Sequence, residues 1–328
     1  MFKTLDHSKP RQLRTLGILA IGSLALSACG SSSADESSAN AATSDGMHEV
    51  NIGYFPLVHT STIIQAEEAG YLEEAGISAE LMQTEGGAAA IPSLISGDID
   101  ILYSNYTSIL LAAEQGLPVA LVAGNDIATD DHGIFVTEDS DIEDLSDLEG
   151  KSFAVNNLQN IGTVAIYAQL EEVGVGPEDV DLVEMPNPDM APALANGNVD
   201  AIWQVEPFQT ISEQSGLRRI GDMFDGPASD MPVGGWVTTQ EFADSNPEVI
   251  DSFRQALGQA GDDLQRNHEL HLELVPSYTE IDVSVAEELA LPNYDTDLQI
   301  DVLQHGADMM HEYGIIAEPL KVSDLVVE

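Results

Sequence analysis

The sequence predicts an α/β fold with two lobes, each a mostly parallel sheet flanked by helices. The first observation is that short apolar runs alternate with helix-like segments of about ten residues, as in parallel strands joined by crossover helices. The second is that this alternation begins near residue 50 and begins again near residue 151. The third is chain length, because about 280 residues beyond the N-terminal segment exceed what one hydrophobic core usually holds.

The N-terminus has the pattern of a secretory signal. Lys and Arg residues precede a short apolar run at 16–26, which is shorter than the roughly 20 apolar residues of a membrane-spanning helix. The following Leu26-Ser27-Ala28-Cys29 resembles a bacterial lipobox, in which the cysteine is diacylated and becomes the first mature residue. We therefore expect a signal peptide at 1–28 and a lipid on Cys29, the only cysteine, rather than a core cysteine. Residues 29–46, rich in small and polar types, are predicted to form a flexible tether.

The composition is strongly acidic. The chain has 10 Lys and Arg against 57 Asp and Glu, which gives a formal net charge of −47 at pH 7. Binding to nucleic acid, or to anionic lipid through a basic patch, is excluded because phosphate contacts need clustered cations. The acids are scattered and 43% of the residues are hydrophobic, which indicates a folded protein. Such a surface favours adaptation to high salt, where screening weakens self-repulsion; an ordinary acidic extracellular protein is the alternative.

The expected elements follow the chain in order. For lobe one the pattern predicts strands at 50–55, 77–83, 99–103 and 118–123, and helices at 62–75, 88–95 and 108–114. For lobe two it predicts strands at 151–155, 180–185, 199–205 and 217–220, and helices at 162–173, 190–195 and 208–214. The last third is predicted to be helical at 247–271, 283–289 and 298–313.

The chain is expected to cross between the lobes twice. The acid-rich stretch 137–149 is the predicted first crossing, and the Gly- and Pro-rich stretch 226–235 is the predicted return. We therefore assign residues 47–137 and 234–328 to lobe one and residues 138–233 to lobe two.

A short signature occurs once in each predicted lobe. Gly97-Asp98-Ile99-Asp100 and Gly197-Asn198-Val199-Asp200 each follow a helix-like segment and precede an apolar run. The pattern indicates a helix that ends at a glycine, a tight turn, and a strand that opens after the aspartate. The carboxyl end of such a strand is the sheet edge where ligands of open α/β folds bind.

These motifs, in this order, are similar to those of the nitrate/sulfonate/taurine-type solute-binding proteins of ABC importers, a group that includes binders of thiamine pyrimidine precursors. The resemblance covers about residues 50–260. It depends on the order and spacing of several short motifs, none of which is specific alone: Ile52-Gly53-Tyr54-Phe55-Pro56, Glu67 to Ile77, Gly97-Asp98-Ile99-Asp100, Gly116-Leu117-Pro118-Val119, Asp147 to Lys151, Val199-Asp200-Ala201-Ile202 and Glu206-Pro207-Phe208.

The resemblance implies a two-lobed, type II periplasmic-binding-protein fold that closes around a small solute. It also implies an extracytoplasmic protein, anchored here to the outer face of the cell membrane through Cys29, that delivers the solute to a permease and its ATPase. No cofactor and no metal are expected, and the chain is expected to be a monomer.

The family places its ligand at the strand ends and helix N-termini that face the cleft between the lobes. Transferred to this sequence, that placement implies the following ligand-binding residues: Tyr54, Phe55, His59, Gly86, Gly87, Ala88, Asn105, Tyr106, Thr107, Asn156, Asn157, Asn160, Gly162, Thr163, Trp203, Glu206, Gly235 and Trp236.

Each of these residues also has a structural interpretation. Gly86-Gly87 could be only a turn, and Asn105 and Asn160 could be helix N-caps. The two tryptophans could belong to the core. Glu206 could be a solvated acid before a proline.

The distribution of basic residues narrows the solute. No Lys or Arg occurs between Arg14 and Lys151, and Lys151 opens a predicted strand at the end away from the cleft. A bound anion would therefore depend on helix dipoles and backbone N–H groups, which suits a sulfonate better than nitrate. Aromatic and amide side chains suit a nitrogen heterocycle, such as a thiamine pyrimidine precursor or riboflavin, which stays open beside an alkyl sulfonate or taurine-like solute.

An enzyme on the same fold is the alternative class, because the resembling family includes a pyrimidine synthase that uses histidine and a cysteine-rich segment. This chain has no cysteine besides Cys29, which argues against that chemistry, and we identify no catalytic residues. His268-Glu269-Leu270-His271 lacks the i, i+4 histidine spacing of zinc proteases, and we expect it to lie on a solvated helix face.

Overall fold

The computed structural model describes residues 46–229 and 231–327, which belong to one compact unit. The predicted signal peptide, the predicted lipid carrier Cys29 and the tether up to residue 45 lie outside the described residues. None of the helices in the described ranges combines the length and apolar character that a membrane crossing requires.

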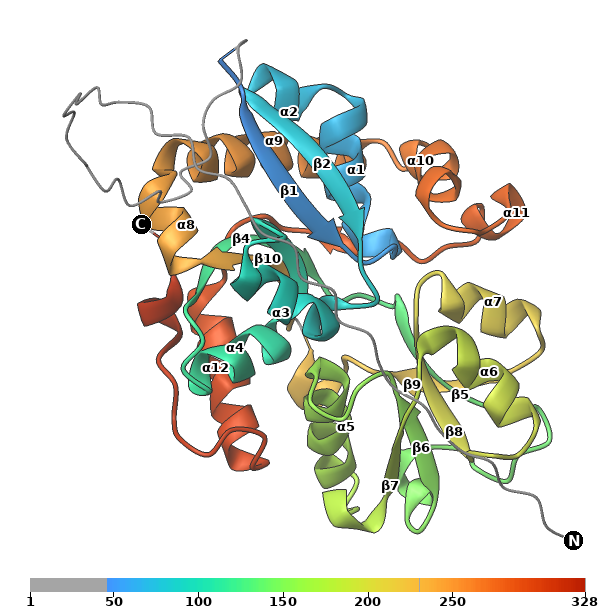
Figure 1. Cartoon of the computed structure of the whole chain (residues 1–328). Coiled ribbons are helices and arrows are strands. Elements are labelled where there is room, and N and C mark those ends of the chain that lie inside the picture. Colours follow the sequence, from blue (N-terminus) through green and yellow to red (C-terminus); the bar gives the residue numbers. More distant parts are fainter. Residues whose placement is uncertain (1–45, 230, 328) are drawn as a thin grey trace, which may run out of the picture. The chain divides into compact units, whose positions relative to one another are not determined.

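Two sheets organise the described chain (Figure 1). The first, here called sheet A, has the strand order β11-β4-β10-β3-β1-β2, with bounds β1 His48–Tyr54, β2 Ile77–Gln83, β3 Ile101–Asn105, β4 Val119–Ile127, β10 Pro232–Thr239 and β11 Asn293–Tyr294. The second, sheet B, has the order β7-β6-β8-β5-β9, with bounds β5 His132–Val136, β6 Ser152–Val155, β7 Asp181–Glu184, β8 Ala201–Val205 and β9 Arg218–Asp222. The predicted α/β fold with two sheets is confirmed.

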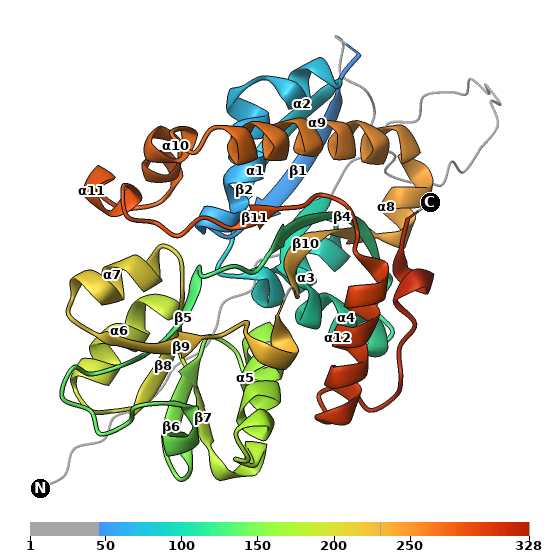
Figure 2. The ribbon, with the colours of Figure 1, turned by 180° about the vertical axis from the view of Figure 1, so that it is seen from behind.

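Helices cover both faces of sheet A, which with its helices is called lobe one below (Figures 1 and 2). Alternate residues of β3 serve the two faces: Ile101 and Tyr103 enter one hydrophobic cluster and Leu102 enters the other. The first face packs against α1 Ser61–Glu68, α2 Tyr71–Glu74, α8 Gln240–Ser245, α9 Pro247–Arg266 and α10 Leu270–Tyr278. The second packs against α3 Gly87–Ser96, α4 Tyr106–Glu114 and α12 Ile300–Glu312.

Sheet B and its helices form lobe two. α5 Ile161–Glu172 packs on one face, where Phe153 and Val155 of β6 join its cluster, and α6 Asn187–Ala195 packs on the other against Ala154. α7 Phe208–Gln214 follows β8. Shorter elements are α11 Val283–Ala286 and the 3₁₀ turns η1 Val58–Thr60, η2 Leu145–Leu148, η3 Pro177–Asp179, η4 Gly226–Ala228 and η5 Val322–Leu325.

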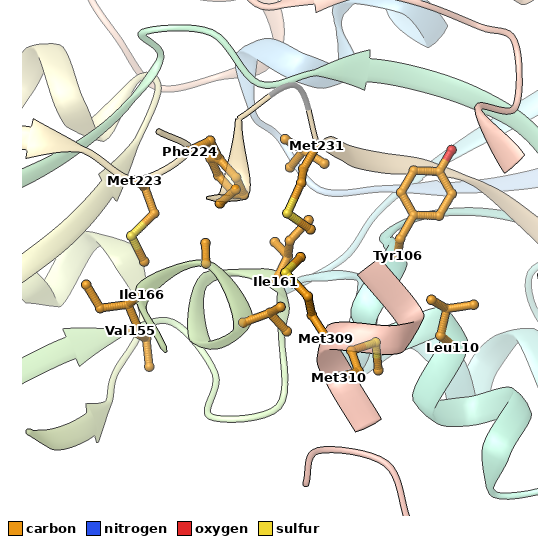
Figure 3. Packing of buried hydrophobic residues seen from close by; sticks show 14 of the residues in the cluster. Tyr106, Leu110, Val155, Ile161, Ile166, Met223, Phe224, Met231, Met309 and Met310 are labelled. Atoms are coloured by element: carbon orange, nitrogen blue, oxygen red, sulfur yellow. The ribbon is translucent and has the colours of Figure 1, made fainter. Parts of the chain in front are cut away.

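One hydrophobic cluster extends across both lobes (Figure 3). It brings Tyr106 and Leu110 of α4, Ile161 of α5 and Met310 of α12 together with Met231 of the return crossing. All five side chains are buried. The contact between the lobes is therefore apolar on this side, and methionine side chains adapt readily to such irregular surfaces.

The first crossing lies earlier than the sequence analysis placed it. Residues 132–136, assigned to lobe one, form β5, which pairs antiparallel with β8 and β9 of sheet B. The chain therefore leaves sheet A at 128–131, and the predicted crossing at 137–149 lies entirely beyond β5. On the return, β10 begins at Pro232 and not at the predicted residue 234. The β5 run is short, and its partner strands β8 and β9 come about 70 and 85 residues later, so local periodicity did not reveal it.

Each sheet contains one long reversed strand that follows a crossing. β10 is antiparallel to both β3 and β4, and β5 is antiparallel to both β8 and β9. The remaining long strands of each sheet run in one direction, as the parallel pairs β1·β2, β1·β3, β6·β7 and β6·β8 show. The reversed strand places its first residues at the carboxyl ends of its neighbours.

The doubled signature has the predicted local structure in both lobes. Gly97 and Gly197 end α3 and α6 with positive φ of 81° and 69°, a conformation that glycine adopts without strain. The carboxylate of Asp100 accepts the N–H of Asn51 at 2.8 Å, and that of Asp200 accepts the N–H of Ser152 at 2.8 Å. Asp100 thus holds the middle of β1 and Asp200 holds the first residue of β6.

Two predicted helices are interrupted. The segment predicted as a helix at 62–75 forms α1 and α2, with a turn at Gly70 between them. The segment predicted at 247–271 forms α9 and α10, and the break falls at 267–269. The long helix α9 crosses sheet A (Figure 2) and buries a stripe at helical spacing: Val249, Ile250, Phe253, Ala256, Leu257, Ala260 and Leu264.

Candidate functional site

A cavity of about 60 Å³ lies where the two sheets face each other with the carboxyl ends of their strands. Lobe one contributes Phe55, Leu57, His59, Gly86, Gly87, Tyr103, Asn105 and Val233. Lobe two contributes His132, Asn156, Asn160, Ile161, Asn187, Trp203 and Val205. His132 reaches this edge because β5 runs backwards, which places its first residue opposite Val205, the last residue of β8.

Several residues expected to bind the solute line this cavity: Phe55, His59, Gly86, Gly87, Asn105, Asn156, Asn160 and Trp203. Asn105 and Asn160 also have the alternative role, since each caps a helix. The side chain of Asn105 accepts the N–H of Ser108 at 2.9 Å, and that of Asn160 accepts the N–H of Gly162 at 3.0 Å. Capping therefore fixes these amides at the cavity wall and does not compete with a site role.

Other expected residues lie near the cavity without lining it. The hydroxyl of Tyr54 accepts a hydrogen bond from Gln83 at 3.1 Å, and its ring meets Tyr278 edge-on. Tyr106 and Thr107 face a small cleft between α4, α5 and α12, beside Met310.

Expected lobe-two residues, and Ala88 of lobe one, are displaced in the same way. Asn157 and Ala88 line a separate surface hollow beside α3. Gly162 lies against the indole of Trp203, where a Cβ atom would approach Cζ3 to 2.4 Å. Thr163 donates its hydroxyl to the carbonyl of Asn157 at 3.4 Å.

Trp236 and Gly235 belong to the packed interior of lobe one. The Trp236 side chain is completely buried between Tyr103 and Phe253, and its indole N–H donates to Asn125 Oδ1 at 3.0 Å. Gly235 leaves room for the hydroxyl of Tyr106, since a Cβ there would come within 2.4 Å of it.

Glu206 is buried, and not the solvated acid that was the alternative. Its carboxylate accepts hydrogen bonds from Thr210 Oγ1 at 2.9 Å and from the N–H of Ala290 at 3.0 Å. Burial outweighs these hydrogen bonds and raises the pKa of Glu206 to about 7. Glu206 thus connects lobe two to the C-terminal segment of the chain, and it is not a cavity wall.

Two helix N-termini meet at the cavity. Gly86 and Gly87 begin α3, and Asn160 and Ile161 begin α5. The first N–H groups of a helix have no partner within the helix, and the helix dipole gives this end a partial positive charge. Backbone N–H groups from both lobes can therefore bind one anionic group.

The cavity wall also carries polar atoms without a partner. Asn187 Oδ1 and Trp203 Nε1 are buried and make no hydrogen bond within the described residues. Buried polar groups in native proteins are nearly always paired, so an acceptor and a donor are available to a solute here. Among the lining residues no Lys or Arg occurs, as the sequence predicted. Arg218 instead donates to the carbonyl oxygens of Ser140 and Ile142.

A buried cluster of histidines and carboxylates forms one end of the cavity. His59 Nε2 lies 2.8 Å from Asp131 Oδ2 and 3.8 Å from Asp126 Oδ2, and His132 Nε2 lies 3.8 Å from the same oxygen of Asp131. All four side chains are at most 1% exposed. The two imidazole rings are 5.0 Å apart, and His132 stacks on Trp203 at 5.7 Å.

The cluster holds its histidines in different protonation states. Burial opposes the charged form of His59, but Asp126 and Asp131 outweigh it and raise the pKa of His59 to about 9. Burial lowers the pKa of His132 to about 3, despite Asp131, with a further decrease from charged His59. Burial also acts against ionised Asp131, yet the neighbouring histidines and the N–H of Thr129 hold its pKa well below the ordinary value. At neutral pH His59 is therefore cationic and His132 neutral.

Asn125 organises the wall behind this cluster. Its Oδ1 accepts from Thr62 Oγ1 at 2.6 Å and from Trp236 Nε1, and its Nδ2 donates to Asp126 Oδ1 at 2.7 Å and to the carbonyl of His59 at 2.9 Å. All four hydrogen-bonding positions of the amide are satisfied. The side chain of Asn125 therefore holds two of the predicted residues, His59 through its backbone carbonyl and Trp236 through its indole N–H.

The sequence reasoning missed His132, Asn187, Asp126 and Asp131. The two aspartates end β4 and the first crossing, and His132 begins the strand that was not predicted. Asn187 begins α6 just before Pro188, at a helix start that the sequence analysis placed three residues later. A search for polar residues at the ends of every apolar run would have found Asn125-Asp126 and Asp131-His132.

The fold therefore has two lobes, with a cavity between the carboxyl ends of their strands. Residues 58–269 match the model of the NMT1/THI5 like family, and the chain belongs to this family. Its relatives include the taurine-binding periplasmic protein of Escherichia coli K12, 23% identical over 207 residues. That alignment covers 63% of each chain, so the match spans less than two thirds of the relative's length. A Bacillus subtilis relative, whose name assigns it provisionally to aliphatic sulfonates, is 23% identical over 88% of this chain and 89% of its own.

A solved structure has the same fold. The alkanesulfonate-binding protein SsuA from Xanthomonas axonopodis pv. citri, bound to MOPS, superposes with a TM-score of 0.73 at 18% identity. The superposition covers 85% of this chain and 97% of that one. The names of these three proteins describe binding.

The histidine pair in His268-Glu269-Leu270-His271 does not lie on a solvated face as expected. His271 is buried and stacks on Tyr294 at 5.7 Å, with its Nε2 2.9 Å from the tyrosine hydroxyl. His268 alone is exposed, in the turn between α9 and α10. The expectation was wrong because it assumed one continuous helix through this segment.

Proposed function

We propose that the chain is the solute-binding lipoprotein of an ABC importer and that its solute is a small organic molecule with a sulfonate-like group. It would be exported, anchored to the outer face of the cell membrane through a lipid on Cys29, and act as a monomer that delivers the solute to a permease and its ATPase. Family membership supports the solute-binding role, and the lipobox-like sequence at 26–29 supports the anchor.

The observation that carries the solute class is the meeting of two helix N-termini, those of α3 and α5, at one cavity. A sulfonate has three acceptor oxygens and one negative charge, so it matches backbone N–H groups and the unpartnered Nε1 of Trp203. An amine at the other end of a taurine-like solute would match Asn187 Oδ1. Phe55 and Trp203 supply an apolar wall for the carbon chain.

Solute entry requires the lobes to separate. The cavity of about 60 Å³ is much smaller than the roughly 300–1,000 Å³ of typical ligand sites. The chain passes between the lobes at 128–131 and again between β9 and β10, and a few residues at such crossings can absorb a hinge rotation.

The test is solute screening on the purified chain by thermal shift and calorimetry. Taurine or an alkyl sulfonate should raise the melting temperature, because a ligand at 100 times its Kd stabilises the native state by about 2.7 kcal/mol. Asn187→Ala should weaken binding about 10-fold, the effect of one lost hydrogen bond of roughly 1.4 kcal/mol. Asn198→Ala, on an exposed turn, is the matched control and should bind as the parent does.

Two outcomes would contradict the proposal. If no sulfonate changes the melting temperature but a thiamine pyrimidine precursor or a flavin does, the solute is the heterocycle that aromatic Phe55 and Trp203 also suit. If Asn187→Ala and Asn198→Ala bind a sulfonate equally, this cavity is not the site.

An enzyme on the same fold is the second candidate, favoured by the buried cluster of His59, Asp131 and His132. Strongly shifted pKa values in a cavity are typical of catalytic groups, although ion-pair networks produce them too. Chemical turnover of a bound solute by the isolated chain would establish the enzyme, and recovery of the solute unchanged would support the binding protein.

A further inference from the structure

We propose that His59, Asp131 and His132 form a binding site for a divalent transition-metal ion at the end of the cavity. Each residue offers one ligand atom, and these atoms all lie within 4.8 Å of one another. Two imidazoles and a carboxylate are a donor set that Zn²⁺ and its neighbours in the first transition row prefer. The inference does not depend on which solute the protein carries.

Two of the three ligand-atom distances require only a small adjustment. Metal–ligand bonds of about 2.1 Å in a tetrahedral site place neighbouring ligand atoms about 3.4 Å apart. His59 Nε2 and Asp131 Oδ2 are 2.8 Å apart, and His132 Nε2 and Asp131 Oδ2 are 3.8 Å apart. Side-chain shifts of about half an ångström would therefore bring these two pairs to this spacing, while the two histidine nitrogens, which lie within 4.8 Å of each other, would close around the ion.

The carboxylate is oriented for this task by its surroundings. Asp131 Oδ1 accepts the N–H of Thr129 at 2.9 Å and its hydroxyl at 3.1 Å. Oδ2 is thereby directed at the two imidazoles. Hydrogen bonds that fix a ligating group in this way are a regular property of metal sites.

The histidine nitrogens point to the same conclusion. His132 is 1% exposed, and neither of its ring nitrogens has a hydrogen-bond partner within the described residues. A buried imidazole with two unpaired nitrogens costs free energy that one coordinate bond would recover.

Charge balance also favours a dication. Asp126 and Asp131 place two carboxylates within 3.8 Å of the His59 ring nitrogen, and no Lys or Arg side chain lies among the residues that line the cavity. A divalent ion would displace the proton of His59, as metal binding to an imidazole does, and would lie close to both carboxylates. Because His59 and His132 line the cavity, a fourth coordination position would open toward it.

The experiment titrates the chelator-treated chain with Co²⁺ and then Zn²⁺. A Cys29→Ser background removes the only thiol. We expect one Co²⁺ per chain with visible d–d absorption, displacement by stoichiometric Zn²⁺, and no displacement by excess Mg²⁺. His132→Gln should weaken Co²⁺ binding by at least about 100-fold, since it removes a direct ligand. His305→Gln, at an exposed position of α12, should leave binding unchanged.

Loss of the fold must be separated from loss of the ligand. Circular dichroism and the melting temperature check His132→Gln, and Asp131→Asn provides a second variant that keeps the side-chain volume. Absence of a stoichiometric Co²⁺ spectrum, or equal binding by His132→Gln and His305→Gln, would overturn the site. Displacement of Co²⁺ by Mg²⁺ would assign the binding to the acidic surface. Sulfonate binding measured in the presence of chelator tests the proposed function separately.

Discussion

At the scale of single residues, Gly162 determines where Trp203 can lie. Gly162 is the second residue of α5, and a Cβ there would meet Trp203 Cζ3 at 2.4 Å and Cε3 at 2.5 Å. His132 stacks on the same indole, so Trp203 has little room to retreat. The glycine expected to touch the solute therefore has an indirect role, which is to position an aromatic wall of the cavity.

Gly162→Ala should destabilise the protein by about 1–3 kcal/mol and weaken solute binding, because the indole must move. Helix propensity alone would make alanine stabilising by up to about 1 kcal/mol. A decrease in the free energy of unfolding would therefore identify the contact with Trp203. Urea unfolding and calorimetry measure the two effects.

Gly221→Ala is the matched control for Gly162→Ala. No atom lies within 4 Å of a Cβ at Gly221, and its φ is outside the left-handed region. We expect this variant to unfold within about 0.5 kcal/mol of the parent. If Gly162→Ala proved more stable than the parent, the packing explanation would be wrong.

At the scale of elements, α10 is attached to lobe one through a buried histidine. His271 packs flat on Tyr294 of β11, and the tyrosine hydroxyl donates to the carbonyl of Val58 at 3.0 Å. Burial lowers the pKa of His271 to about 4, with a smaller contribution from His268 in the same direction, against a hydrogen bond that raises it. The element is therefore held by a histidine that must stay neutral.

Acidification should weaken this attachment. The pKa of His271 is about 4 in the folded state and about 6.5 when unfolded, so the unfolded state binds more protons between these values. The stability present above pH 6.5 is thus lost as pH falls toward 4, by about 2 kcal/mol between pH 7 and pH 5.

Urea unfolding of the parent and of His271→Gln at pH 7 and pH 5 isolates this effect. The variant should have a lower free energy of unfolding at pH 7 and should lose about 2 kcal/mol less than the parent on acidification. His268→Gln, at the exposed neighbour, should keep the parental pH dependence. If the free energy of unfolding decreased equally from pH 7 to pH 5 in the parent and in His271→Gln, other groups would cause the acid sensitivity.

At the scale of the whole molecule, net charge is the dominant property. The formal charge of −47 produces self-repulsion in the compact state, and the few ion pairs of the described residues, such as Arg254 with Asp251 at 3.6 Å, offset little of it. Salt screens this repulsion, because the Debye length falls from about 10 Å at 0.1 M to about 3 Å at 1 M.

Raising NaCl from 0.1 M to 1 M should therefore increase the melting temperature by about 4 °C or more, the equivalent of roughly 1–2 kcal/mol for a chain of this size. Differential scanning calorimetry measures this shift. A variant that neutralises three exposed acids, Glu138→Gln with Asp139→Asn and Asp141→Asn, should show a smaller increase.

The matched control keeps the charge and changes only length: Glu138→Asp with Asp139→Glu and Asp141→Glu. It should respond to salt as the parent does. A melting temperature that is insensitive to salt would mean that the acidic surface does not limit stability, and the expectation of salt adaptation would fail.

Much of the fold was predictable because its signals are local. Strand alternation, helix stripes and the glycine helix ends at Gly97 and Gly197 each depend on neighbouring residues. β5 was missed because its pairing with β8 and β9 joins segments about 70 to 85 residues apart, and no local pattern records such pairing. The break at 267–269 was missed for a related reason, since tertiary contacts of His271 override the helical pattern.

The site was predictable only in part. Phe55, Gly86, Gly87, Asn105 and Asn160 follow from their places at strand ends and helix starts, because the fold brings those ends to one edge. The order of elements therefore predicted which ends would meet. It did not predict which side chain at each end would point inward, as Trp236, Tyr106 and Asn157 demonstrate.

The sequence by itself determined the α/β class, the acidic surface, the absence of Lys and Arg from the cavity wall and the local ends of α3 and α6, since each depends on composition or near neighbours. Only the tertiary structure decided the contents of the cavity. Reversal of β5 brings the sequence neighbours Asp131 and His132 across from His59, some 70 residues away. Desolvation at that meeting point sets the protonation of both histidines, and burial of this kind exists only after the two lobes pack.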